Sequence, residues 1–121
     1  KLVKFHLKHN KIATMTVVKP TARFGEVFLK GSAVNKFEEK PQLNQNWING
    51  GFFVLNYKIF NYIEKDSTML ERKPLLSLVK KKELLAFKHK RFWQCMDTMR
   101  DKNILLALLN KNKAPWKKLK K

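Results

Sequence analysis

Short apolar runs, separated by prolines, glycines and clusters of polar residues, divide the chain into strands and helices. β-Branched and aromatic residues dominate the runs that are typical of strands. Pro20 ends the first of these runs, and Lys30-Gly31-Ser32 joins two others as a hairpin. The predicted strands are residues 12–18, 26–29, 33–39, 51–55 and 84–89.

Apolar residues at helical spacing predict helices between and around these strands. Asn10 follows the first helix as a left-handed cap, and Pro74 fits the first turn of a later one. Ile59, Phe60 and Ile63 are expected to face the core. Helices that alternate with strands indicate an α/β fold with a mixed sheet. The predicted helices are residues 2–9, 57–63, 74–80 and 98–109.

The composition is typical of a globular chain. A length of 121 residues with 44% hydrophobic residues indicates one domain, or a piece of one, with its own core. No apolar run is long enough to span a membrane, and no secretory or transit signal opens the sequence. A single cysteine, Cys95, excludes an internal disulfide and a zinc site built from cysteines. We therefore expect a cytoplasmic protein without a membrane partner.

A formal net charge of +18 makes a basic nucleic-acid-binding module the main alternative to an enzyme. The lysines, however, are spread along the whole chain, and only four residues are arginines, which are the side chains suited to planar, bidentate contacts. This distribution favours a solvated basic surface, and we expect no specific nucleic-acid partner. Binding to DNA or RNA that weakens steeply with salt would favour the alternative.

The stretch FEEKPQLNQNWINGGFF combines residue types that suit a ligand with hydroxyls and a phosphate. Glu39 offers an acceptor, Lys40 a compact cation and Asn49 an amide, while Gly50 and Gly51 leave backbone donors uncovered. A structural interpretation is also open, and spacing alone favours it. A Glu–Lys pair at a strand end is usually solvated, and Asn-Gly-Gly is usually only a turn.

Other candidate residues lie outside this stretch. Gly25 is placed in a loop where a ligand could meet the main chain. Asp97 precedes the last helix and could simply cap it. His6 and His9 lie three residues apart, but no third metal ligand is in view, so exposed imidazoles are the better interpretation.

The ordered motifs RFG, FEEKP, INGGFFVLN, FWQCMDTMRDK and KAPWK resemble those of the bacterial glucose-1-phosphate cytidylyltransferases. The resemblance covers essentially all 121 residues and implies a partial Rossmann-like nucleotidyltransferase fold. It implies formation of CDP-glucose and pyrophosphate from CTP and glucose 1-phosphate, on the way to dideoxysugars of cell-surface polysaccharide. UTP or dTTP in place of CTP is the alternative within the same class.

The family's glycine-rich nucleotide loop and second metal-binding aspartate have no counterpart in this sequence. Residues 1–121 are therefore expected to be a single C-terminal, sugar-binding portion, inactive alone, from an enzyme that assembles as a homo-oligomer. Cys95 stands where the family pattern has proline. The resemblance implies Mg²⁺ as cofactor, with Lys40 acting catalytically on the sugar phosphate. The implied site is Gly25, Glu39, Lys40, Asn49, Gly50 and Arg100 for the substrate and Asp97 for the metal.

Overall fold

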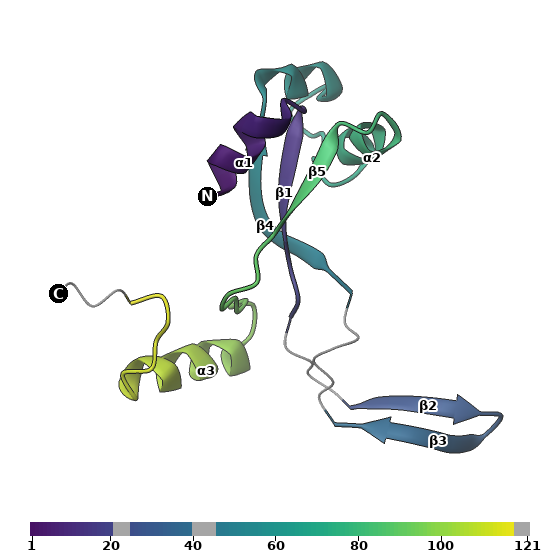
Figure 1. Ribbon diagram of the computed structural model, residues 1–121, viewed down its shortest axis with the longest axis vertical. Coiled ribbons are helices and arrows are strands. Elements are labelled where there is room, and N and C mark those ends of the chain that lie inside the picture. Colours follow the sequence, from purple (N-terminus) through teal and green to yellow (C-terminus); the bar gives the residue numbers. More distant parts are fainter. Residues whose placement is uncertain (21–24, 40–45, 118–121) are drawn as a thin grey trace. The chain divides into compact units, whose positions relative to one another are not determined.

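The computed structural model describes residues 1–20, 25–39 and 46–117 (Figure 1). The chain divides into two compact units, one formed by residues 1–18 and 47–89 and the other by residues 19–46 and 90–121. Among the described residues, no helix is both long and apolar enough to cross a membrane.

A three-stranded mixed sheet organises the first unit, which confirms the predicted fold class. β1 (Ala13–Val18) lies in the centre, between β4 (Ile48–Leu55) and β5 (Leu84–Lys88). β4 runs antiparallel to β1, and β5 runs parallel to it. β4 begins earlier than the predicted residue 51, because Ile48 pairs with Val18 of β1.

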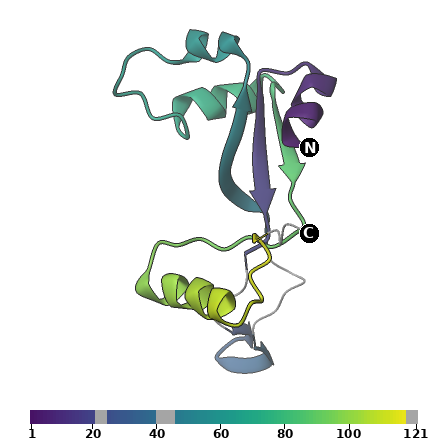
Figure 2. The ribbon, with the colours of Figure 1, turned by 90° about the vertical axis from the view of Figure 1, so that its left-hand side faces the viewer.

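Helices cover both faces of this sheet. The 3₁₀ helix η1 (Tyr57–Tyr62) and α2 (Lys73–Lys80) pack on one face, and α1 (Leu2–His9) packs on the other (Figure 2). Successive strand residues point to opposite faces, so buried Ala13 joins the core while buried Thr14 faces α1. Each large aliphatic side chain buried in such a core contributes about 1.5–3 kcal/mol. The core cluster is Ala13, Ile59, Leu75 and Leu78.

The prediction that Phe60 faces the core is wrong. Its side chain is 71% exposed, whereas the neighbouring Ile59 is 4% exposed. A 3₁₀ helix has about three residues per turn, so consecutive side chains point in directions about 120° apart. Ile59 therefore faces the core and Phe60 cannot, while Ile63 packs against the core from the end of the helix.

The second unit contains the predicted hairpin and the last helix. β2 (Glu26–Lys30) and β3 (Ala33–Glu38) pair antiparallel. Gly31 joins them with φ of 61°, a left-handed conformation that glycine adopts readily. α3 (Met99–Asn110) begins after Thr98.

Candidate functional site

β4 is distorted at the Asn-Gly-Gly sequence. Two steps along β1, from Met15 to Val17, correspond to four steps along β4, from Phe53 to Asn49. β4 therefore bulges, and Gly51 adopts φ of 84° within the bulge. Bulges of this kind often lie beside functional sites, where they redirect a strand.

Gly50 and Asn49 have structural roles in this bulge. A Cβ atom on Gly50 would lie 3.1 Å from the carbonyl oxygen of Thr16 and 3.1 Å from a methyl group of Val18. Gly50 therefore allows β4 to lie close against β1. Asn49 is exposed, and its Oδ1 accepts a hydrogen bond of 2.8 Å from the backbone N–H of Gly51. The oxygen of the Asn49 amide thus stabilises the bulge.

Gly25 precedes β2 and packs against β3. A Cβ atom there would lie 2.7 Å from the ring of Phe37 and 3.2 Å from the carbonyl oxygen of Glu38, so a larger residue would displace the ring. Glu39 follows the end of β3 and is exposed. Lys40 lies outside the described residues.

Asp101, which the sequence interpretation missed, organises the segment that carries Asp97. Asp101 is 2% exposed, and its carboxylate accepts hydrogen bonds from the backbone N–H groups of Asp97 at 3.3 Å and Thr98 at 3.1 Å and from the side chain of Gln94 at 3.2 Å. Thr98 Oγ1 accepts from the N–H of Asp101 in return. This reciprocal pair is a capping box, so the expectation that Asp97 caps α3 is wrong. The Thr-x-x-Asp spacing in the sequence was a usable signal for it.

Asp97 and Arg100 are both exposed at the start of α3. The capping box leaves the carboxylate of Asp97 without a hydrogen bond from any described residue. Over residues 1–20, 25–39 and 46–117, no three His, Cys, Asp or Glu side chains gather as a metal site. A single carboxylate still fits Mg²⁺, which commonly takes one or two carboxylates and completes its coordination with substrate phosphates and water.

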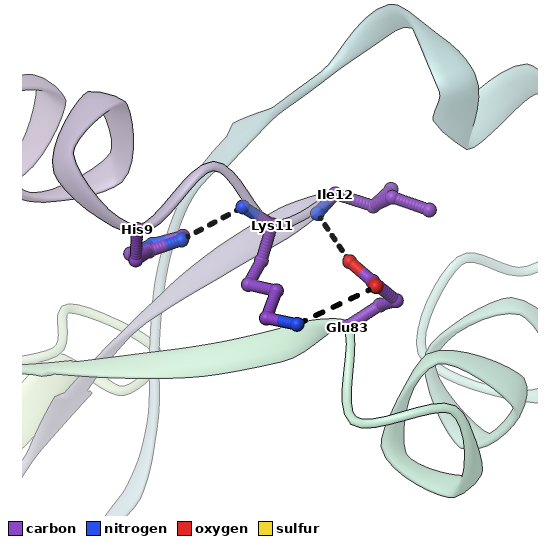
Figure 3. Close-up of polar contacts among 4 residues, drawn as sticks. All are labelled: His9, Lys11, Ile12 and Glu83. Carbon is purple, nitrogen blue, oxygen red and sulfur yellow. Dashed lines mark hydrogen bonds and ion pairs between the residues drawn. The ribbon is translucent and has the colours of Figure 1, made fainter.

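The expectation of exposed histidines is wrong. His6 is 7% exposed, and its Nδ1 lies 2.9 Å from Thr14 Oγ1. His9 Nε2 lies 2.7 Å from the same hydroxyl, and its Nδ1 accepts from the backbone N–H of Lys11 at 3.0 Å (Figure 3). Because His9 Nδ1 accepts, the proton of its neutral ring sits on Nε2, which donates to Thr14. The Thr14 hydroxyl is then free to donate to His6 Nδ1.

This hydrogen-bonded chain joins α1 to β1 and uses Nδ1 of His6 and both ring nitrogens of His9. Burial, and then the neighbouring His9, lower the pKa of His6 below its usual 6.5. Glu83 holds the other side of the same turn, accepting from the Ile12 N–H at 3.2 Å and pairing with Lys11 Nζ at 3.6 Å (Figure 3). The histidines therefore have a structural role.

Comparison with known proteins now identifies the family. The nucleotidyl transferase family model matches residues 1–105. The chain belongs to this family. It is 47% identical over 115 residues to the glucose-1-phosphate cytidylyltransferases of Salmonella typhimurium and Salmonella typhi, a match that covers 95% of this chain and 45% of each relative. The chain thus spans about half the length of these curated relatives.

A solved structure supports the fold of this nucleotidyl transferase chain. A Bacillus anthracis protein described as a glucose-1-phosphate thymidylyltransferase, in complex with sucrose, superposes with a TM-score of 0.57 at 17% identity. The superposition covers 98% of this chain and 50% of that one. At this identity the likeness shows the shared α/β fold alone.

The candidate residues of this nucleotidyl transferase chain lie on three elements. Asn49 and Gly50 belong to the bulge of β4, in the first unit. Gly25 and Glu39 flank the hairpin, and Asp97 and Arg100 lie at the start of α3, all in the second unit. Their assembly into one site stays a prediction, as does the position of this chain within the relatives' length.

Proposed function

We propose that this chain is the sugar-phosphate-binding portion of a glucose-1-phosphate cytidylyltransferase. The observation that carries the proposal is its 47% identity over 115 residues to enzymes of that name. The bulge of β4 supports it, because a Cβ atom on Gly51 would have no atom within 4 Å, so a sugar could approach the main chain there. In this proposal Asn49 and Gly50 line the sugar pocket, with Gly25 meeting the sugar through its main chain.

The charged residues would act on the sugar phosphate. Glu39 would accept hydrogen bonds from sugar hydroxyls, and Lys40 would hold the phosphate. Arg100, which lies close to Asp97 in the sequence, would also bind the substrate. An oxygen of the glucose 1-phosphate attacks the α-phosphorus of CTP, and pyrophosphate leaves. A cation at position 40 would reduce the repulsion between the two phosphate-bearing substrates, since position and charge neutralisation supply most of the catalysis in such transfers.

Asp97 would supply one carboxylate to Mg²⁺, which when bound neutralises phosphate charge. The capping box fixes the backbone on both sides of this residue through Asp101. Asp97 itself stays exposed, so its carboxylate can reach a hydrated ion without first breaking a protein contact.

Activity is expected to require more than these residues. The chain spans about half the length of the curated cytidylyltransferases, and its sequence has no glycine-rich loop to hold a nucleotide triphosphate. We expect negligible CDP-glucose from the 121-residue chain with CTP, glucose 1-phosphate and Mg²⁺. Clear turnover would contradict this expectation, and UTP or dTTP in place of CTP would then test base choice.

Binding of glucose 1-phosphate tests the proposal directly. With ¹⁵N-labelled protein, the amide signals of Gly25, Asn49 and Gly50 should shift with glucose 1-phosphate and much less with glucose 6-phosphate. Glu39→Gln should weaken binding roughly 10-fold, because a hydrogen bond to a charged group contributes about 1.5–3 kcal/mol.

The matched control is Glu71→Gln, which removes another exposed carboxylate and should leave binding unchanged. Equal shifts with both sugar phosphates, or equal weakening in both variants, would show general attraction of anions to a basic chain. Either result would refute a site specific for a sugar 1-phosphate.

A further inference from the structure

We propose that the cleft between η1 and α2 binds anions that carry two or more phosphate groups. The cleft is a cavity of about 490 Å³, within the range of roughly 300–1,000 Å³ usual for small-molecule sites. It shares no residue with the proposed sugar-phosphate site, so this inference does not depend on the proposed function. Its polar wall is formed by Lys58, Asn61, Tyr62, Lys73, Ser77 and Lys81.

Helical spacing explains why these side chains meet. Lys73, Ser77 and Lys81 are four residues apart, so they lie along one face of α2 and its C-terminal cap. Across the cleft, Lys58 and Asn61 are three residues apart on η1, which is one turn of a 3₁₀ helix, so they lie on the same face. Two short helices that contact each other thus direct ammonium, amide and hydroxyl groups into one space.

The charges in the cleft are unbalanced. Glu64, also in the lining, forms an ion pair with Lys73, and these two charges cancel. Lys58 Nζ has no carboxylate partner among the described residues. Lys81 Nζ lies 3.4 Å from the hydroxyl oxygen of Tyr62 and 4.9 Å from the centre of its ring, and it has no carboxylate partner within the described part of the chain. Two positive charges therefore remain for an anion to neutralise.

The cationic side chains of the cleft are of a kind that suits phosphate groups. The lining contains lysines and no arginine, and ammonium groups act on phosphate as compact point charges with three donors each. The side chains of Asn61 and Ser77 form no hydrogen bond with described residues, so they can donate to further phosphate oxygens. Charges held in a concave site concentrate counter-ions more strongly than the same charges on a flat surface.

A double variant tests the proposal against the general basicity of the chain. Lys58→Gln with Lys81→Gln should weaken binding of inorganic pyrophosphate roughly 10-fold or more, measured by isothermal titration calorimetry. The matched control is Lys4→Gln with Lys102→Gln, which removes the same charge from exposed positions of α1 and α3. The control should change the dissociation constant less than about 2-fold.

A comparison of pyrophosphate with sulfate at equal ionic strength distinguishes a specific site from general attraction of anions to a basic chain. Pyrophosphate should bind more tightly than sulfate to the unsubstituted chain, and the double variant should lose this preference. Equal weakening in the two double variants, equal binding of the two anions, or no pyrophosphate binding at millimolar concentration would each overturn the proposal. Retained binding of glucose 1-phosphate by the cleft variant would leave the proposed function intact.

Discussion

Two threonines on β1 give a direct test of the hydrogen-bonded chain between α1 and the sheet. Thr14 and Thr16 are two residues apart on the same strand face, with exposures of 0% and 7%. Thr14 Oγ1 lies 2.9 Å from His6 Nδ1 and 2.7 Å from His9 Nε2. Thr16 Oγ1 is buried and has no hydrogen-bond partner among the described residues. The same substitution, Thr to Val, should therefore have opposite consequences at the two positions.

The hydrogen bonds set the expected magnitudes. Thr14→Val removes two hydrogen bonds between neutral groups, each contributing about 0.5–1.5 kcal/mol, and leaves the buried Nδ1 of His6 unpaired. Together these losses should lower the free energy of unfolding by about 2–4 kcal/mol. Thr16→Val removes a buried hydroxyl that makes no bond, so it should be neutral or stabilise the chain by up to about 1 kcal/mol.

Urea denaturation followed by circular dichroism at pH 8 measures both changes. This pH lies well above the lowered pKa of His6, so the His6 ring is neutral and its contact with Thr14 reports hydrogen bonding and not charge. Equal destabilisation by both substitutions would refute the reasoning, because it would show that methyl and hydroxyl packing, not the histidine contacts, decides the effect. A larger cost for Thr16→Val would refute it as well.

Three further predictions concern other buried groups. Because the pKa of His6 is lowered in the folded state, its neutral form contributes fully to stability above pH 6.5, and this contribution is lost as pH falls through the lower folded pKa. His6→Asn should therefore flatten the decline in urea midpoint between pH 7.5 and 5. An unchanged slope would contradict this prediction. Gly50→Ala places a Cβ 3.1 Å from the carbonyl oxygen of Thr16 and should destabilise by about 1–3 kcal/mol in the same assay, whereas an unchanged midpoint would refute the close approach. Asp101→Asn weakens a buried cap and should lower the free energy of unfolding, measured by thermal unfolding, by about 2–3 kcal/mol. The substitution Asp97→Asn, at an exposed position, should change it by no more than about 0.5 kcal/mol. Equal effects would contradict the capping box.

The hairpin and the first strand show what local chemistry can predict. Gly31 supplies the left-handed turn between β2 and β3, and a β-branched run followed by Pro20 defines β1. Asn10 caps α1 with φ of 53°, as its residue type suggests. These features depend on backbone preferences within a few residues, so one sequence was enough to place them.

The candidate site was predictable only in part. The residue types of the Asn-Gly-Gly sequence indicated a tight turn or a close approach to the backbone, whereas the structure shows a bulge within β4, where Gly50 lies close against β1. The sequence did not show that the Asn49 oxygen would bond to Gly51, nor that Asp101 would fix the segment before α3. Each depends on which of several nearby donors a polar side chain reaches, and spacing alone does not decide that choice.

The sequence by itself determined the order of strands and helices and, through its motifs, the nucleotidyl transferase family. Only the tertiary structure decided that His6 is buried and that Phe60 is exposed. It also decided that β4 begins at Ile48, where pairing with β1 extends the strand. The physical reason is that burial and strand pairing arise from contacts between segments far apart in the chain, whereas turns and caps arise from neighbouring residues.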